Sequence, residues 1–185
     1  MAATPLLRPP RVALRPALPG DAPLLARWRA EPSVGRHQPL QDASIADLRS
    51  DLARQRPEEI FRGRGERFQW IVTADGEPVG WITLAITSWE HGLAEIGYAL
   101  TTAAQGRGIQ TQALQMLLAD LFLETPLERV EARCAVDNVA SQRVLEKVGF
   151  VREGLLRAYF LLAGRRIDNY LYALLRRDFL PQPPA

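Results

Sequence analysis

Residues 105–111 constrain this chain most, because they read Gln-Gly-Arg-Gly and then open a long apolar helical pattern. A short glycine turn before a helix leaves several backbone N–H groups unpaired, and the helix dipole adds partial positive charge at the same place. Such a turn can bind a pyrophosphate without a lysine. We therefore expect residues 105–111 to form a phosphate site. A plain turn between a strand and a core helix has the same local pattern and stays open as the alternative.

Two other phosphate loops do not fit this turn. A nucleotide P-loop needs Gly-Lys-Ser/Thr, whereas Gly108 is followed here by Ile109 and Gln110. A dinucleotide-binding loop needs a third glycine where this chain has Thr111. Because both alternatives fail, the turn has to be interpreted together with a second element downstream.

That second element covers residues 137–150 and has the pattern of a short capped helix. Asp137 or Asn138 can cap its start through a side-chain oxygen. Gly149 suits the left-handed conformation in which many helices end, and Phe150 then begins a strand pattern. A turn and a helix therefore follow each of two predicted strands.

The composition fits one soluble globular domain. The 185 residues are 47% hydrophobic and 24% charged, and no apolar run approaches the ~20 residues needed to cross a bilayer. The net charge of +2 gives no field that would recruit nucleic acid or a membrane. The first residues lack a secretory signal, and the single Cys134 excludes an internal disulfide. We expect a cytoplasmic protein with neither nucleic acid nor membrane as partner.

Hydrophobic periodicity predicts both strands and helices. The predicted strands cover residues 11–15, 67–74, 79–89, 94–100, 128–136, 150–162 and 166–175. The predicted helices run from Asp21 to a stop at Pro32, from a cap at Asp42 or Ser44 to Pro57, from Gly108 to Pro126, and from Asn138 to Gly149. We expect one domain over residues 10–179, with short tails at 1–9 and 180–185, built as a sheet with helices on its faces.

The two helices after residue 108 should each bury one apolar stripe. For the first helix the expected core residues are Ile109, Ala113, Met116, Leu117 and Leu121, with Leu114 and Leu118 beside them. For the second helix they are Ala140, Val144 and Val148. Cys134 lies in the middle of a predicted strand, so we expect a buried structural thiol rather than a nucleophile.

Four spaced elements together resemble the GNAT N-acetyltransferases: residues 95–98, residues 105–108, the Asn138–Ser141 spacing, and residues 149–154. The resemblance extends from about residue 10 to 179 and is closest to the branch that acetylates N-terminal amines of ribosomal proteins. It implies an α+β (three-layer α/β) fold with a mixed, mostly antiparallel sheet of six or seven strands and helices on both faces.

The resemblance also implies acetyl-coenzyme A as co-substrate. The fourth strand would diverge from the fifth, the pantetheine arm would lie in the gap, and Asn138 would bind that arm with Ser141 near the sulfur. The implied coenzyme-binding residues are Ala99, Leu100, Gln105, Gly106, Arg107, Gly108, Ile109, Gln110, Thr111, Asn138 and Ser141. Gln110 departs from the family, which has Gly or Ala there, so its side chain would crowd the phosphate or add a hydrogen bond.

Acetyl transfer to an amine needs a neutral amine, donors for the oxyanion, and a proton for the leaving thiolate. The resemblance makes Ser141 the proton donor and Glu95 the general base. A capping serine and a structural carboxylate are the alternatives for these two residues. The glutamate that the family often carries near residues 157–160 is absent here. Asp168, His37 and His91 are further candidate bases, although each is more often a surface residue.

The acceptor is expected to be a primary amine. An α-amine with a pKa of about 8 is about a tenth neutral at pH 7, whereas a lysine amine costs about 3 kcal/mol more to deprotonate. A site without a strong base therefore favours a protein N-terminal α-amine. By resemblance the two helices between the first and second strands, with residues 36–38 in their connection, form one wall of the acceptor cleft. Basic residues in the candidate loops make an acidic cleft for polyamines or aminoglycosides less expected, namely Arg36, His37, Arg62 and Arg64.

A small-molecule N-acetyltransferase for an antibiotic or polyamine is the nearer alternative function, and a non-catalytic protein that binds acetyl-coenzyme A is the alternative of another class. No His or Cys cluster has the spacing of a metal site. A homodimer is expected only because many relatives pair through exposed strands or helices.

Overall fold

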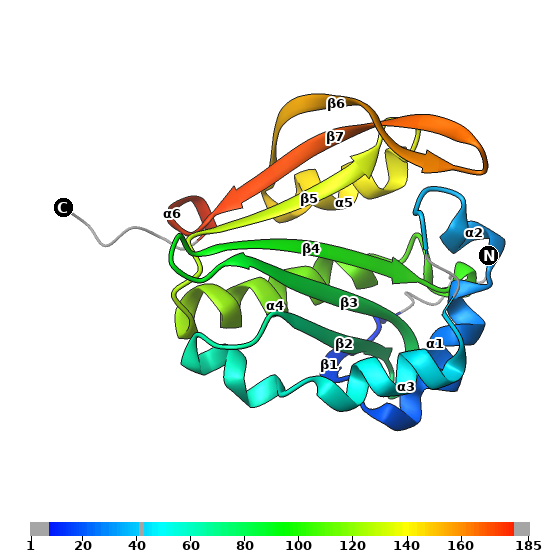
Figure 1. The fold of residues 1–185 in the computed structure, drawn as a ribbon, viewed down its shortest axis with the longest axis horizontal. Helices are drawn as coiled ribbons and strands as arrows, with labels where there is room; N and C mark the ends of the chain where they lie inside the picture. Colours follow the sequence, from blue (N-terminus) through cyan, green and yellow to red (C-terminus); the bar gives the residue numbers. More distant parts are fainter. Residues whose placement is uncertain (1–7, 41–42, 180–185) are drawn as a thin grey trace, which may run out of the picture.

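The computed structural model describes residues 8–40 and 43–179. It contains a seven-stranded sheet in the order β1-β2-β3-β4-β5-β7-β6 (Figure 1). The strands are β1 Val12–Pro16, β2 Arg67–Ala74, β3 Glu77–Ser88, β4 Leu93–Leu100, β5 Arg129–Ala135, β6 Val151–Leu162 and β7 Arg165–Leu175. Among these strands β4 and β5 are parallel and the other neighbours are antiparallel. The prediction of a mixed, mostly antiparallel sheet is confirmed.

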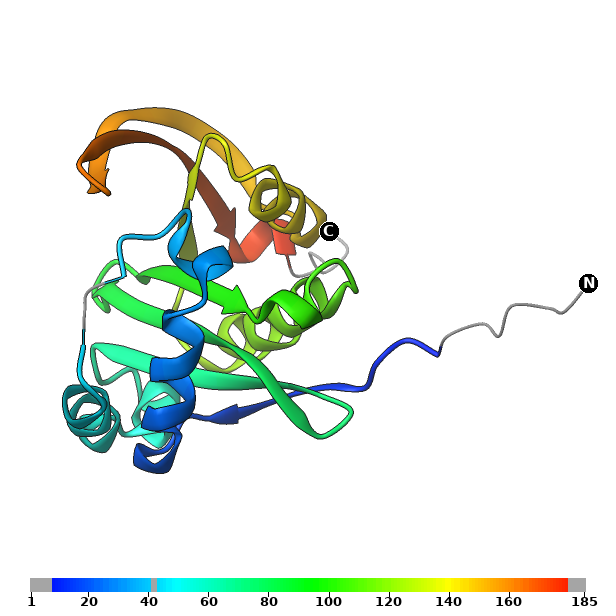
Figure 2. The same cartoon turned by 90° about the vertical axis from the view of Figure 1, so that its right-hand side faces the viewer.

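Helices cover both faces of the sheet (Figure 2). They are α1 Ala22–Arg29, α2 Pro32–Gly35, α3 Ile45–Arg54, α4 Ile109–Glu124, α5 Val139–Val148 and the short α6 Arg176–Phe179. One core lies between the sheet and α4 and α5, and it includes Leu114, Leu118 and Tyr172. A second core lies under α1 and α3, where the Trp28 and Trp81 rings stack with centroids 6.1 Å apart.

Proline placement explains one difference from the predicted helices. We expected Pro32 to end a helix, but α1 already ends at Arg29 and Pro32 is the first residue of α2. Proline suits that position because its fixed φ matches a helix and its missing N–H would be unpaired there anyway. At α3 the Ser44 hydroxyl caps the helix by accepting from the Asp47 N–H at 3.1 Å. The alternative cap, Asp42, lies outside the described residues.

Two expected core positions are wrong. Met116 on α4 is 38% exposed, because the helix is apolar on nearly all sides and sequence periodicity could not tell which edge faces solvent. Ala140 on α5 is also exposed, while Leu145 and Val148 take the core positions of that helix. Cys134 is buried as expected.

The β4–β5 pairing is short, and this opens the middle of the sheet. Residues 93–95 of β4 pair with residues 129–131 of β5, and no further pair follows. On its other side β4 stays paired with β3 as far as Leu100. The two parallel strands therefore diverge, as the resemblance implied, and the gap between their C-terminal halves lies beside the start of α4 and α5 (Figure 1). No helix in the described part of the chain is long and apolar enough to span a membrane.

Candidate active site

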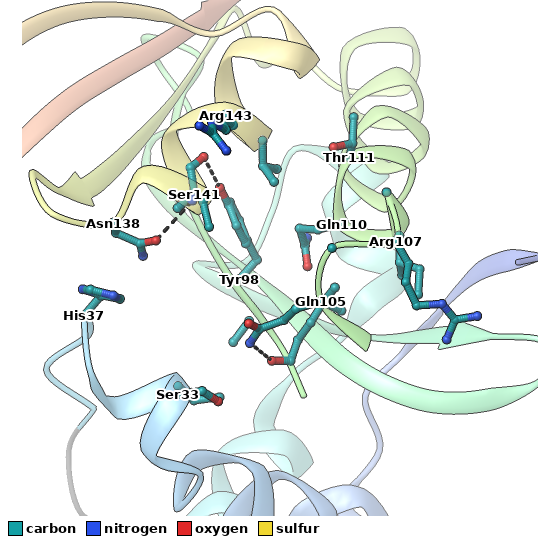
Figure 3. A pocket seen from close by; sticks show the side chains of 18 of the residues that line it. Ser33, His37, Tyr98, Gln105, Arg107, Gln110, Thr111, Asn138, Ser141 and Arg143 are labelled. Carbon is teal, nitrogen blue, oxygen red and sulfur yellow. Dashed lines mark hydrogen bonds between the residues drawn. The ribbon is translucent and has the colours of Figure 1, made fainter. Parts of the chain in front are cut away.

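A cavity of about 430 Å³ lies where β4 and β5 diverge (Figure 3). Its walls come from the end of β4, the turn before α4, one side of α5, and α2 with the connection after it. The sequence-predicted residues that line it are Ala99, Leu100, Gln105, Gly106, Arg107, Gly108, Ile109, Gln110, Thr111, Asn138 and Ser141. The structure thus brings all the expected coenzyme residues to one cavity. Glu95, the expected base, does not line it.

The glycine turn has the geometry of an anion site. Gly106 and Gly108 have φ of 74° and 75°, in the left-handed region that other residues rarely adopt. Gly108 is the N-cap of α4 and offers no side-chain cap, and the first turn of the helix contains no acidic residue. The N–H groups of residues 109–111 therefore remain available to a ligand at the positive end of a helix with 16 residues.

The charge of the cavity wall is uniformly positive. Arg36, Arg107, Arg143 and Lys147 line it, and among the described lining residues there is no Asp or Glu. The arginines and the lysine come from three separate parts of the chain, namely the connection after α2, the glycine turn and α5. The cavity is therefore suited to an anionic ligand that extends beyond the glycine turn.

The main chain at the end of β4 presents its donors to the gap. The Tyr98 carbonyl accepts a hydrogen bond from Gln38 Nε2 at 2.8 Å, and the Leu100 carbonyl accepts one from Gln105 Nε2 at 3.1 Å. In an extended strand the N–H and C=O of one residue point to the same side. The N–H groups of Tyr98 and Leu100 therefore also face the gap.

Ala99 lines the cavity, but its main chain points away. The next residue of the same parity, Thr101, donates its N–H to the Val79 carbonyl on the β3 side at 2.9 Å. Because main-chain direction alternates along a strand, the N–H and C=O of Ala99 also point toward β3. Ala99, one of the implied coenzyme-binding residues, therefore faces the cavity without its main-chain groups, whereas those of Tyr98 are directed into the gap.

Asn138 and Ser141 are linked at the start of α5. Asn138 Oδ1 accepts from the Ser141 N–H at 3.1 Å and caps the helix, as one of the sequence alternatives proposed. Among the described residues the Asn138 amide nitrogen has no partner, and Asn138 lines the cavity. One side chain can thus cap the helix with its oxygen and donate to a ligand with its nitrogen.

Tyr98 supports Ser141 from beneath. The tyrosine hydroxyl lies 2.8 Å from Ser141 Oγ and donates to the Ser141 carbonyl at 3.3 Å. Burial raises the pKa of Tyr98 well above its ordinary value, so the hydroxyl keeps its proton. If Tyr98 donates to Oγ as well, the proton of Ser141 is free to point into the cavity. Sequence reasoning missed Tyr98, although its place between Ile96 and Leu100 on a half-buried strand required a partner for the hydroxyl.

Gln110 lies inside the cavity wall. Its side chain is 5% exposed, and neither of its amide atoms has a hydrogen-bond partner among the described residues. Leaving a buried polar group unpaired costs about 1–3 kcal/mol. The departure from the family pattern thus places an unsatisfied amide against the space beside the glycine turn (Figure 3).

Glu95 belongs to the last residue pair between β4 and β5 and does not line the cavity. It shares strand parity with Ala99, which packs in the core under α1. The Glu95 carboxylate forms an ion pair with Arg133 of β5. Glu95 therefore does not contact the cavity directly, and its role as general base stays a prediction of the resemblance.

The other candidate bases lie in three different places. His37 lines the cavity, and His91 lies in the turn between β3 and β4, outside it. Asp168 accepts the N–H of Ala158 at 2.7 Å within the β6–β7 hairpin. Of the three, His37 alone reaches the cavity.

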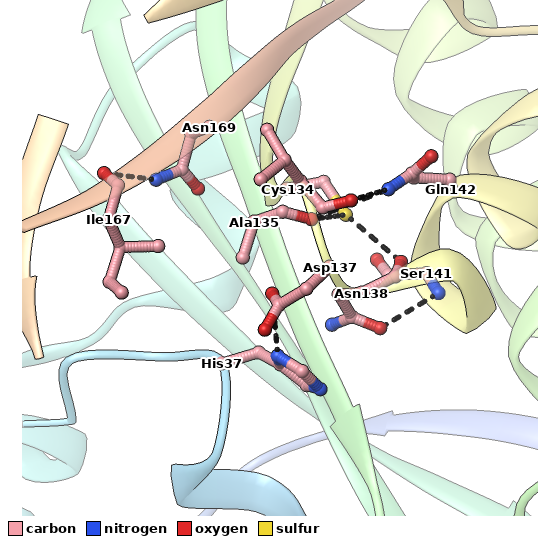
Figure 4. A network of polar contacts seen from close by, with 10 residues as sticks. His37, Cys134, Ala135, Asp137, Asn138, Ser141, Gln142, Ile167 and Asn169 are labelled. Carbon is pink, nitrogen blue, oxygen red and sulfur yellow. Dashed lines mark hydrogen bonds and ion pairs between the residues drawn. The ribbon is translucent and has the colours of Figure 1, made fainter. Parts of the chain in front are cut away.

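Cys134 lies behind the first turn of α5 (Figure 4). Its Sγ is 3.5 Å from the Asn138 carbonyl oxygen, and burial raises the pKa of the thiol. A buried, protonated thiol is a poor nucleophile. In the described ranges no group of three or more His, Cys, Asp or Glu side chains could hold a metal ion.

Comparison of the sequence with known proteins identifies relatives. A family model described as "Acetyltransferase (GNAT) domain" matches residues 11–151. The uncharacterized N-acetyltransferase p20 of Bacillus licheniformis is 31% identical over 169 residues, which covers 91% of this chain and 95% of that protein. The ribosomal-protein-serine acetyltransferase of Escherichia coli K12 is 34% identical over 114 residues, or 62% of this chain and 64% of that protein.

Solved structures of acetyltransferases have a similar fold. Mycobacterium smegmatis RimJ, in complex with a coenzyme A disulfide, superposes with a TM-score of 0.80 at 31% identity, over 95% of this chain and 88% of that one. RimL, a ribosomal α-N-protein acetyltransferase in complex with coenzyme A, superposes with a TM-score of 0.77 at 25% identity, over 89% of this chain and 93% of that one.

Proposed function

Because the chain belongs to the GNAT acetyltransferase family, its chemistry is acetyl transfer to nitrogen, and we propose that it moves the acetyl group of acetyl-coenzyme A to a protein N-terminal α-amine. The observation that carries the proposal is the cavity wall, which is basic, free of carboxylates over the described residues, and continuous from the glycine turn to the end of β4. Such a wall suits an anionic coenzyme and offers nothing to attract a polycation.

The coenzyme would bind along this wall. Its pyrophosphate would accept from the N–H groups of residues 109–111, with Arg107 and Lys147 neutralising charge. The pantetheine arm would follow the gap, and the Asn138 amide would donate to one of its carbonyls. The Gln110 amide would pair with the coenzyme and so lose the cost of being buried without a partner.

The reacting groups would meet at the end of β4. The N–H of Tyr98 or Leu100, directed into the gap, would stabilise the oxyanion that forms on the thioester carbonyl. Ser141 would protonate the departing thiolate, and the Tyr98 hydroxyl would donate a hydrogen bond to the Ser141 oxygen that has lost its proton. Each group acts on charge that develops in the transition state.

The acceptor site favours an α-amine over a polyamine. Glu95 and Glu131 form the last residue pair between β4 and β5, and both form ion pairs with arginines of β5. Asp137 lies beside the cavity and contacts His37. Each of these carboxylates is paired with a basic side chain and would provide little of the acidic surface that a polyamine or an aminoglycoside needs. The relatives named for ribosomal-protein acetylation support the same acceptor class.

The proposal includes a homodimer formed through β6. This strand is at the edge of the sheet and exposes Val151, Leu155 and Leu161 by 60%, 49% and 56%. An exposed edge strand with apolar side chains can pair with a second copy of itself.

A thiol-release assay with acetyl-coenzyme A tests the proposed function. The acceptors are peptides with free N-termini, the same peptides with blocked N-termini, a polyamine and an aminoglycoside. We expect turnover on free peptides that disappears when the N-terminus is blocked. Turnover on the polyamine or aminoglycoside alone would support the small-molecule alternative. Coenzyme binding without turnover on any amine, unchanged in Ser141→Ala, would support a non-catalytic protein.

A further inference from the structure

We infer that His37 is the general base of the transfer and that Asp137 orients its imidazole ring, an inference that rests on the proposed function. The amine must lose a proton as it attacks the thioester, and Glu95, the base that the resemblance implies, is paired with Arg133 and does not line the cavity. A base is therefore needed within the cavity itself.

His37 and Asp137 come together across the gap between the strands. His37 Nδ1 lies 3.2 Å from Asp137 Oδ1, although the two residues are 100 positions apart in the sequence (Figure 4). His37 follows α2, and Asp137 lies between β5 and α5. The His37 side chain is 20% exposed and that of Asp137 is 70% exposed. The carboxylate is thus on the solvent side, and the ring lines the cavity.

This contact decides which ring nitrogen is basic. A carboxylate can only accept at Nδ1, so it selects the tautomer with the proton on Nδ1 and the lone pair on Nε2. Within residues 8–40 and 43–179, Nε2 has no hydrogen-bond partner. The orienting carboxylate and the free nitrogen are the two features that a histidine base requires.

The segment that carries His37 is fixed to the end of β4. The neighbouring Gln38 donates to the Tyr98 carbonyl at 2.8 Å, and the Ser33 hydroxyl lies 2.8 Å from the Thr102 hydroxyl. Glu31 accepts from the Thr102 N–H at 3.0 Å. The base is therefore held beside the N–H groups that would bind the oxyanion, on the wall that faces Ser141 across the same cavity (Figure 3).

The charged groups around His37 come from several elements. Asp137 is its contacting carboxylate. Arg36 and Arg143 line the same cavity. The Asp168 main chain accepts the Val136 N–H, and the Asp168 carboxylate accepts from the Ala158 N–H.

The step balances as follows in atoms and electrons. The amine nitrogen forms a bond with the thioester carbon while the π pair of the C=O bond moves onto the oxygen, and the proton of the nitrogen passes to His37 Nε2. The C=O bond re-forms as the carbon–sulfur bond breaks, and the thiolate takes a proton from Ser141. The imidazolium releases its proton to solvent, and Ser141, which lines the cavity, regains one from solvent. An imidazole suits an α-amine, whose ordinary pKa is about 8, better than a lysine amine at about 10.4.

The pH dependence of kcat/KM tests this role. The variants are His37→Gln, Asp137→Asn and, as matched control, His91→Gln at the second histidine of the chain. We expect His37→Gln to lose about 100-fold at pH 7 and Asp137→Asn about tenfold, in line with the usual contribution of a general base. The loss of kcat/KM in His37→Gln should shrink as the pH rises past the pKa of the acceptor amine, because the amine is then already neutral. His91→Gln should match the wild type.

Two controls separate a base from a structural contact. Coenzyme affinity measured by calorimetry should be the same in His37→Gln and the wild type. A His37→Ala variant should regain activity when free imidazole is added. An equal loss at every pH, an absent rescue, or full activity of His37→Gln would overturn the assignment while leaving the proposed function intact. A wild type that acetylates no amine would overturn both.

Discussion

Substitution of Gln110 should change both the stability of the free protein and its affinity for the coenzyme. Its side chain is 5% exposed and both amide atoms lack partners within the described chain. Methionine has a similar volume and no amide, so Gln110→Met removes the unsatisfied groups without opening a large cavity. At about 1–3 kcal/mol for a buried unpaired group, we expect the coenzyme-free protein to gain about 2 kcal/mol in unfolding free energy.

A gain of this size in the free energy of unfolding raises Tm by about 4–8 °C in a protein of this length. The same substitution should weaken binding of the coenzyme. If the amide pairs with acetyl-coenzyme A, its loss costs about 1.4 kcal/mol, near the upper end for one hydrogen bond, and raises Kd about tenfold. Thermal unfolding without ligand and titration calorimetry measure the two effects.

A control on the same helix isolates the effect. Gln112 is exposed on α4, so Gln112→Met should change neither Tm nor Kd appreciably. A Gln110→Met variant that is less stable than the wild type would show that the amide has partners in the free protein. Unchanged coenzyme affinity would show that the amide does not contact the ligand.

Two further predictions concern stability and assembly. Hydrogen bonds from Arg15 at 2.7 Å hold the pKa of Asp21 below its ordinary value. The pair therefore stabilises the fold at a pH above the ordinary carboxyl pKa, and this contribution is lost as the pH falls through the lowered pKa. Asp21→Asn should lower the free energy of unfolding, measured with urea, by about 1 kcal/mol at pH 7, a figure reduced for the part-exposed arginine, and by much less at pH 3. Equal losses at both pH values would refute this. Leu155→Arg on β6 should convert a dimer to monomer in sedimentation velocity, whereas a monomeric wild type would remove the proposed homodimer.

The phosphate turn could be predicted because its geometry is local. Two glycines with positive φ and the start of a helix are consecutive in sequence, and no distant residue is needed to form them. The same holds for the cap by Asn138, whose partner is three residues away. Strand positions followed from alternation, although β3 begins at Glu77 rather than at the expected residue 79.

The reacting groups could not be predicted in the same way. The contact of His37 with Asp137 and that of Tyr98 with Ser141 join segments far apart in the sequence, and periodicity does not pair segments. The ion pair of Glu95 with Arg133 likewise joins two strands whose pairing periodicity does not predict.

The most direct test of the account is to locate the acetyl group on a peptide product. The acceptor is a peptide with one free α-amine and one internal lysine, incubated with the protein and acetyl-coenzyme A, and analysed by fragmentation in a mass spectrometer. We predict a single acetyl group on the N-terminal residue and none on the lysine. Acetylation of the lysine side chain, or an unmodified peptide alongside turnover on a polyamine, would contradict the account.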